Sequence, residues 1–145
     1  MGASKFFSDE QKNQITYAIK QAEFNTSGEI RVHIENNCKI EVLDRAAEIF
    51  STLQMHKTEQ RNGVLFYVAL DDHKFAILGD AGINAKVPEG FWNEINDTVI
   101  ALFKEEKYTD GLAKGIIMAG EQLKKHFPFQ ANDVNELSDD ISFGK

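Results

Sequence analysis

The eight residues Gly63-Val-Leu-Phe-Tyr-Val-Ala-Leu70 are almost continuously apolar. A strand that is covered on both of its faces has this composition, because neither face meets water. The polar residues Asp71-Asp-His-Lys74 follow, and then the apolar run Phe75-Ala-Ile-Leu78, which predicts an antiparallel hairpin partner. This stretch therefore predicts the central strand of an α/β sheet.

A second strand is predicted at Gly28-Glu-Ile-Arg-Val-His-Ile-Glu35, where apolar and polar residues alternate as in a half-exposed strand. Residues 42–56 lie between the two strands and have the spacing of an amphipathic helix, which predicts a parallel strand pair. Further helices are predicted at residues 9–25, from Pro88 to Phe103, and from Asp110 to Phe127. We therefore expect a three-layer α/β sandwich: a central mixed sheet with helices on both faces.

The chain has the length of one domain, at 145 residues. We expect residues 1–131 to form that domain. Residues 132–145 are acidic and have no apolar period, so we expect them to be a flexible tail.

The composition excludes several classes of function. A net charge of −7 repels phosphate backbones, so we expect no nucleic-acid partner. No run approaches the roughly 18 apolar residues of a membrane-spanning helix, and no signal peptide is visible; we expect a cytoplasmic protein without membrane insertion. A phosphotransferase Asp-x-Asp pattern fails at His73, and the single cysteine, Cys38, rules out a multi-cysteine zinc site.

The polar residues around the predicted hairpin fall into two groups. If Leu70 pairs with Phe75, Asp80 lies opposite Leu65 and about 17 Å from Asp71 and Asp72. One small ligand cannot contact both groups. The sequence therefore predicts two candidate sites, at opposite ends of the sheet.

The first candidate site lies where the two parallel strands begin. It gathers polar residues and one glycine, namely Glu29, Thr58, Arg61, Asn62, Asp80, Gly82 and Asn84. Carboxylate and amide oxygens suit a hard cation such as Ca²⁺ or Mg²⁺, and an arginine can hold a phosphate by two hydrogen bonds. We therefore expect Glu29, Asp80 and Asn84 as metal ligands, and a catalytic group of Asp80, Arg61 and Asn62. The alternative is a structural ion pair of Glu29 or Asp80 with Arg31 or Arg61.

The second candidate site lies at the carboxyl ends of the parallel strands, where ligands of open α/β sheets usually bind. Asp71 and Asp72 stand there, with Asn36 and Asn37 after the neighbouring strand. Two adjacent carboxylates would gain from a cation between them. The alternative is a solvated hairpin turn, for which aspartate is a common choice.

Several stretches resemble the TPM-domain family, whose members include thylakoid-lumen acid phosphatases and many bacterial envelope proteins. The matching stretches are Phe7-Ser-Asp-Glu-Gln11, Ser27-Gly-Glu-Ile-Arg-Val-His-Ile34, Arg61-Asn-Gly-Val-Leu-Phe-Tyr-Val-Ala69, Asp71-Asp-His-Lys-Phe75, Gly79-Asp-Ala-Gly-Ile-Asn84 and Val87-Pro-Glu-Gly-Phe-Trp92. The resemblance implies an α/β sandwich, with divalent cation binding and acid-phosphatase activity in some members. Arg61-Asn62-Gly63 departs from the Asp-Asn-Gly that is common in the family, so one carboxylate is missing here.

Two hypotheses follow. In the first, the chain is a divalent-cation-dependent phosphatase of small phosphate esters, with Glu29 and Asp80 on the metal and Arg61 on the phosphate. In the second, it is a non-catalytic module that binds a cation or a protein partner. That module would use the same acidic end of the sheet or the aromatic residues Phe6, Phe7 and Trp92.

Overall fold

The computed structural model describes residues 3–129 and 137–144. Its sheet has four strands in the order β3-β2-β1-β4. The strands are β1 (Glu29–Glu35), β2 (Gly63–Ala69), β3 (Lys74–Gly79) and β4 (Ser142–Phe143). β1 runs parallel to β2 and β4, whereas β3 is antiparallel to β2. The predicted mixed sheet is confirmed, with β2 in its interior.

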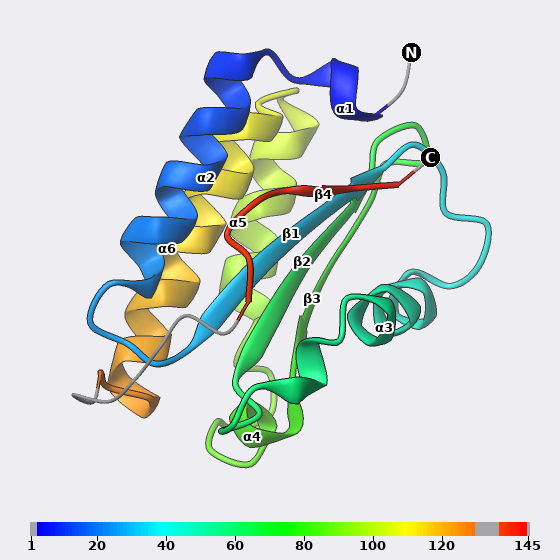
Figure 1. Cartoon of the computed structure of the whole chain (residues 1–145). Coiled ribbons are helices and arrows are strands. Elements are labelled where there is room, and N and C mark those ends of the chain that lie inside the picture. Colours follow the sequence, from blue (N-terminus) through cyan, green and yellow to red (C-terminus); the bar gives the residue numbers. More distant parts are fainter. Residues whose placement is uncertain (1–2, 130–136, 145) are drawn as a thin grey trace.

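Helices cover both faces of the sheet (Figure 1). One face carries the three long helices α2 (Asp9–Glu23), α5 (Asn93–Lys104) and α6 (Tyr108–His126). The other face carries α3 (Val42–Thr52). The short elements are α1 (Ala3–Phe6), the 3₁₀ turn η1 (Met55–Lys57) and α4 (Ala81–Asn84). The predicted three-layer sandwich is confirmed.

The continuous apolar run of β2 supplies two separate cores. Val64, Phe66 and Val68 pack into the core beneath α2, α5 and α6. The alternate residues Leu65, Tyr67 and Ala69 pack into the smaller core beneath α3. Because side chains alternate between the faces of a strand, one run without polar residues can serve both cores.

One predicted helix begins where its capping residues indicate, and another begins later than predicted. The helix α2 begins as expected, because the Ser8 hydroxyl accepts a hydrogen bond from the Gln11 N–H and the Gln11 side chain accepts one from the Ser8 N–H. The helix predicted from Pro88 begins five residues later, at Asn93. Gly90 has a φ of 79°, which is incompatible with a continuous helix through Pro88 to Asn93.

The register of the hairpin differs from the prediction by two residues. Val68, not Leu70, pairs with Phe75, and Val64 pairs with Gly79. Leu70 instead belongs to the turn, in which His73 has a φ of 54°. As a result Asp80 lies beside Gly63, to whose carbonyl it donates its backbone N–H.

Within the predicted flexible tail, Ser142 and Phe143 form the short strand β4. Ser142 pairs with His33 and Phe143 with Ile34, and the Gly144 N–H donates to the Ile34 carbonyl. The short strand β4 therefore hydrogen-bonds the otherwise open lateral edge of β1. Residues 132–136 of the predicted tail lie outside the described residues. Within residues 3–129 and 137–144, no helix is both long and apolar enough to cross a membrane.

Candidate functional site

Most of the buried polar residues lie at one end of the sheet, where β1 and β2 begin and β3 ends. We call this the amino end. They are Thr26, Glu29, Thr58, Asn62 and Asp80. Glu29 pairs with Gly63, and Asp80 bonds to Gly63 from the other side, so three adjacent strands place Glu29, Gly63 and Asp80 in one row. The predicted residues Glu29, Asn62 and Asp80 are thus brought to the same end of the sheet.

Arg61 and Asp80 form a two-pronged ion pair at the amino end. Arg61 Nε donates to Asp80 Oδ2 and Arg61 Nη2 to Asp80 Oδ1, each at 2.8 Å. The hydrogen bonds to Asp80 raise the pKa of Arg61. The Asp80 side chain is 5% exposed, but that of Arg61 is 50% exposed. The ion pair considered as the alternative role of Asp80 is therefore present, with Arg61 as the partner. The Arg61 side chain nevertheless remains open to solvent.

The backbone around this ion pair allows no larger residue at Gly82. A Cβ at Gly82 would lie 2.1 Å from the Gln60 carbonyl oxygen and 2.6 Å from that of Arg61. The Gly82 N–H donates to the Arg61 carbonyl, and Asp80 Oδ1 accepts the Ala81 N–H at the start of α4. Close backbone contact between the Arg61 turn and α4 thus holds Arg61 opposite Asp80.

Asn62 carries a buried oxygen without a partner. Its residue is 1% exposed, its backbone N–H donates to Thr58 Oγ1, and its Nδ2 donates to Ser27 Oγ at 3.3 Å. Within the described residues, Asn62 Oδ1 accepts no hydrogen bond. A buried amide oxygen without a partner destabilises the fold unless a hydrogen-bond donor or a cation satisfies it.

Glu29 is 2% exposed and lies under the C-terminal part of the chain. Its Oε1 accepts the backbone N–H of Leu137. Leu137 also reaches Gly63, because its Cδ1 would lie 3.6 Å from a Cβ at that position. Residues near the C-terminus therefore cover the row that Glu29 shares with Asp80.

Asn84, the third predicted metal ligand, lies in α4 next to Asp80, to whose carbonyl it donates its backbone N–H. Asn84 Nδ2 donates to the Gly79 carbonyl, which is a turn-forming role. Across the described ranges, no group of three or more His, Cys, Asp or Glu residues is arranged to hold a metal ion. Within these residues, the carboxylates alone therefore do not make up a set of three cation ligands.

The two aspartates predicted as a second site serve different neighbours. Asp72 Oδ2 accepts the Cys38 N–H, and Lys74 Nζ donates to the Cys38 and Ile40 carbonyls, so this side of the turn anchors the loop after β1. The Asp71 N–H donates to the Asn36 carbonyl, and its side chain lines a cleft.

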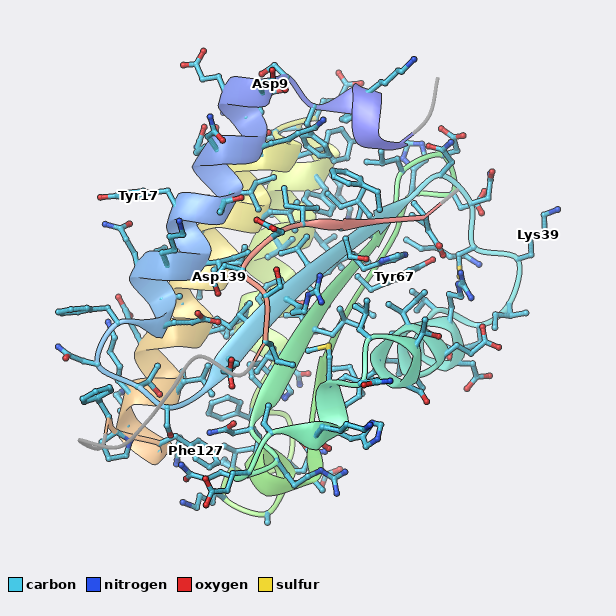
Figure 2. All side chains as sticks on the ribbon, in the orientation of Figure 1. Asp9, Tyr17, Lys39, Tyr67, Phe127 and Asp139 are labelled. Atoms are coloured by element: carbon cyan, nitrogen blue, oxygen red, sulfur yellow. The ribbon has the colours of Figure 1, made fainter. Side chains whose placement is uncertain are left out.

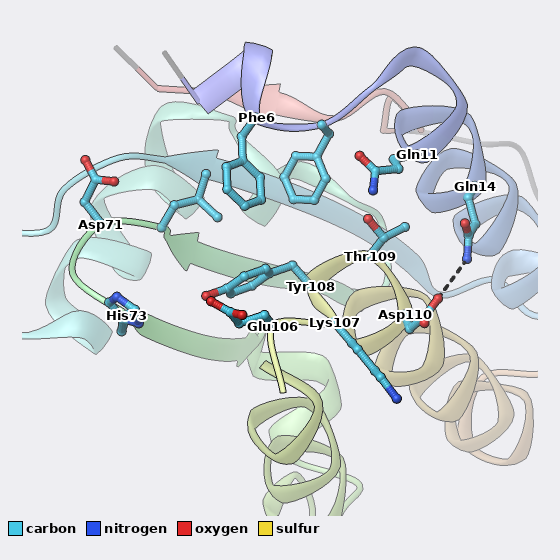
Figure 3. Close-up of a pocket in the computed structure, with 12 residues that line it drawn as sticks. Phe6, Gln11, Gln14, Asp71, His73, Glu106, Lys107, Tyr108, Thr109 and Asp110 are labelled. Carbon is cyan, nitrogen blue, oxygen red and sulfur yellow. Dashed lines mark hydrogen bonds between the residues drawn. The ribbon is translucent and has the colours of Figure 1, made fainter. Parts of the chain in front are cut away.

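That cleft, at the carboxyl ends of β1 and β2, was missed by the sequence analysis. It has a volume of about 610 Å³. Figure 3 shows Phe6 and Tyr108 facing one another across it, with Asp71 and His73 on the side of the hairpin turn. The two aromatic rings lie 5.5 Å apart, centre to centre. No pattern in the sequence indicates that α1 and the start of α6 meet over the hairpin.

A buried polar cluster on β1 was also missed, because the alternation of β1 predicted an exposed face for His33 and Glu35. Both are buried, at 5% and 4% exposure. Glu35 accepts hydrogen bonds from Arg45 Nε and Nη2 at 2.8 and 3.0 Å, from Tyr67 and from His33. Figure 2 shows Tyr67 between the sheet and α3.

Opposing effects act on the ionisation of this cluster. Burial acts to raise the pKa of Glu35, but the hydrogen bonds from Arg45, Tyr67 and His33 outweigh burial and lower it to about 2. Burial lowers the pKa of His33, while burial and the bond to Glu35 raise that of Tyr67. Glu35 is therefore an anion held by fixed donors.

Comparisons with known proteins agree with this fold. The family model described as TPM domain matches residues 3–122. The NMR structure of the BA42 protein from the psychrophilic bacterium Bizionia argentinensis is similar, with 44% identity, 97% of each chain covered and a TM-score of 0.91. No curated protein matches the chain.

Two more distant structures share the fold alone. The N-terminal domain of a P. gingivalis protein has 17% identity and a TM-score of 0.72, covering 88% of this chain and 84% of that one. The N-terminal domain of the cg2496 protein from Corynebacterium glutamicum has 10% identity and a TM-score of 0.67, covering 90% and 81%.

Proposed function

Since this chain belongs to the TPM domain family, we propose that it binds a divalent cation, Ca²⁺ or Mg²⁺, at the amino end and hydrolyses small phosphate esters there. The observation that carries the proposal is Asn62 Oδ1, a buried oxygen that accepts no hydrogen bond within the described residues. It lies at the start of β2. Glu29 begins the neighbouring strand β1, and Asp80 follows the end of the other neighbour, β3.

The residues present fit a hard cation. Ca²⁺ and Mg²⁺ take oxygen ligands, and the amino end carries three side chains with such oxygens on neighbouring strand ends, namely Asn62, Glu29 and Asp80. A bound cation supplies positive charge that offsets the charge of a phosphate ester. Asn62 is held in place for this role by its bonds to Thr58 and Ser27.

Arg61 supplies the specificity for phosphate. Its two donors, Nε and Nη2, now satisfy Asp80, and the same pair of donors matches two oxygens of a phosphate. The arginine is half exposed, so it can turn to a ligand without unburying itself. Once Arg61 binds phosphate, the Asp80 carboxylate is released to accept a proton from the attacking water. As the bond from water to phosphorus forms, the P–O bond to the alcohol breaks, and the alcohol leaves with a proton returned by Asp80 or supplied by solvent.

Turnover of a chromogenic phosphate monoester, with Mg²⁺ or Ca²⁺ and then with excess chelator, tests this function. We expect chelator-sensitive activity that falls by at least about tenfold in Asp80→Asn. Asp71→Asn is the matched control, because it makes the same change at the other end of the sheet and should leave turnover unchanged. Activity that persists undiminished in Asp80→Asn would refute the assignment of this site.

A second candidate function is a non-catalytic module that binds a protein partner in the cleft at the carboxyl end. Of the three aromatic residues considered for it, Phe6 is 45% exposed, but Phe7 is 3% exposed, and Trp92 packs against Gly79 near the amino end. Asp71 and Glu106 line the same cleft, and neither forms a salt bridge within the described residues. This favours a partner with a lysine or arginine side chain.

NMR titration with a short lysine-containing peptide, compared with its acetyl-lysine form, tests the second candidate. Binding through the cleft would shift the amides of Phe6, Asp71 and Tyr108 with the charged peptide only. Equal shifts with both peptides, or none with either, would exclude this candidate.

A further inference from the structure

Residues 137–144, which we call the C-terminal segment, follow β1 along its lateral edge (Figure 1). The segment contacts every polar side chain that β1 directs towards α3. The Leu137 N–H donates to Glu29, and Arg31 Nη2 donates to the Asp140 carbonyl at 3.3 Å. Further contacts join Ser142 Oγ to His33 Nδ1 at 2.9 Å, and place Gly144 against Glu35.

We propose that the C-terminal segment is an autoinhibitory strap, which occupies Glu29 and covers the amino end until a cation displaces it. The inference rests on the function proposed above, because it concerns the regulation of the same site. Glu29 Oε1 cannot accept the Leu137 N–H and coordinate a cation with the same lone pairs at full strength. Competition with the strap therefore arises where a cation approaches Glu29 from the side that Leu137 covers.

The position of Leu137 supports this reading. Gly63, between Glu29 and Asp80, has no side chain, and Leu137 fills part of the space above it together with Met55. The strap thus lies over the gap that separates the two carboxylates. A ligand that contacts both of them would have to move the Leu137 side chain as well as its N–H.

The contacts of the strap suit a displaceable element. Its ladder with β1 is only two residues long, and none of residues 137–144 is classed as buried. By contrast, the β1–β2 ladder extends over seven residue pairs whose β2 members are all buried. Short, partly exposed elements open at a lower free energy than core strands do.

Calorimetric titration of the 145-residue chain with Mg²⁺ or Ca²⁺ tests the strap through the variant Leu137→Pro. Proline has no backbone N–H, so this change removes the bond to Glu29. We expect this variant to bind the cation about tenfold more tightly than the unaltered chain does. That factor corresponds to an unaltered chain in which the strap is undocked about one tenth of the time. Leu137→Ala is the matched control: it keeps the N–H and should tighten binding less.

NMR gives a second measurement that needs no variant. Addition of the cation to the unaltered chain should shift the amides of Leu137, Ser142 and Phe143 together with that of Asn62. If Asn62 shifts while residues 137–144 do not, or if Leu137→Pro binds as the unaltered chain does, the strap is refuted and the cation site stands. If neither the chain nor Leu137→Pro binds a cation, the proposed function fails, and the strap with it.

Discussion

Two arginine–carboxylate pairs lie on the α3 side of the sheet, one at each end. Arg61 binds Asp80 at the amino end, and Arg45 binds Glu35 at the carboxyl end, in both cases through two nitrogens. The two carboxylate side chains are equally buried, at 5% exposure. Their other partners differ, because Glu35 also accepts bonds from Tyr67 and His33.

The comparison shows that the surroundings of an ion pair decide its role. Glu35 keeps two further side-chain donors if Arg45 moves, so its charge stays satisfied and the pair is structural. Asp80 relies on a half-exposed arginine and on the Ala81 N–H, so Arg61 is exchangeable. The same motif is therefore a fixed link in one place and a candidate ligand-binding group in the other.

The largest effect is expected from Glu35→Ala. It leaves Arg45, Tyr67 and His33 without their shared acceptor, and removal of one member of a buried ion pair costs about 3–5 kcal/mol. Urea unfolding measures this loss. Glu48→Ala is the control, because Glu48 binds the same arginine but its side chain is 57% exposed; it should cost less than about 1 kcal/mol. Similar losses in both variants would show that Glu35 is not the fixed link.

Acid sharpens the same comparison. The pKa of Glu35 is about 2 in the folded chain, below its ordinary value of 4.5. The folded state therefore binds this proton less readily than the unfolded state, so the stabilisation is present above about pH 4.5 and is lost as the pH falls towards 2. We expect this contribution to be roughly 2 kcal/mol and to be absent in Glu35→Gln. Unfolding free energies measured from pH 2 to pH 5 test it; parallel profiles for the two proteins would contradict it.

Glu23 should show the opposite dependence. Burial, and then a hydrogen bond with Asp139, raise its pKa from 4.5 to about 9. The folded state retains a proton that the unfolded state releases, so stability should decrease as the pH rises from about 4.5 to 9. Glu23→Gln imitates the protonated form and should gain about 1 kcal/mol at pH 8. Chemical unfolding at several pH values measures this dependence. If the unfolding free energy of Glu23→Gln falls with pH as steeply as that of the unaltered chain, Glu23 is not the cause of the decrease.

The smallest effect on stability is expected from Asp80→Asn. The amide oxygen can still accept the Ala81 N–H, and the lost partner is a half-exposed arginine, so the cost should be about 0.5–1 kcal/mol. Thermal unfolding measures it. A loss as large as that of Glu35→Ala would make Arg61–Asp80 a structural pair and remove the contrast.

The sequence predicted the sheet and its layers because β2 is apolar throughout and the spacing of the helices is regular. It failed where the deciding contact is remote in sequence. His33 and Glu35 read as exposed because the residues that cover them, Arg45 and Ser142, come from α3 and β4. The register of the hairpin was wrong by two residues, since the length of the turn depends on a positive φ at His73.

For the candidate site, the sequence placed Glu29, Asn62 and Asp80 at one end of the sheet, where the structure also has them, because the order of the strands determines it. Their role as ligands stays a prediction. The sequence could not assign the partner of Asp80. Asp80 binds Arg61 because the close backbone contact at Gly82 brings Arg61 Nε to 2.8 Å from Asp80 Oδ2. The spacing of these residues along the chain does not indicate this contact.

β4 also bears on how the protein behaves at high concentration. Without Ser142 and Phe143, the outer edge of β1 at His33 and Ile34 would expose unpaired N–H and C=O groups. Such an edge is a template on which another chain can add a strand, which is a common route to aggregation. Removal of these residues by a protease, or their displacement by a fused partner, would therefore open this part of the edge to pairing with another chain.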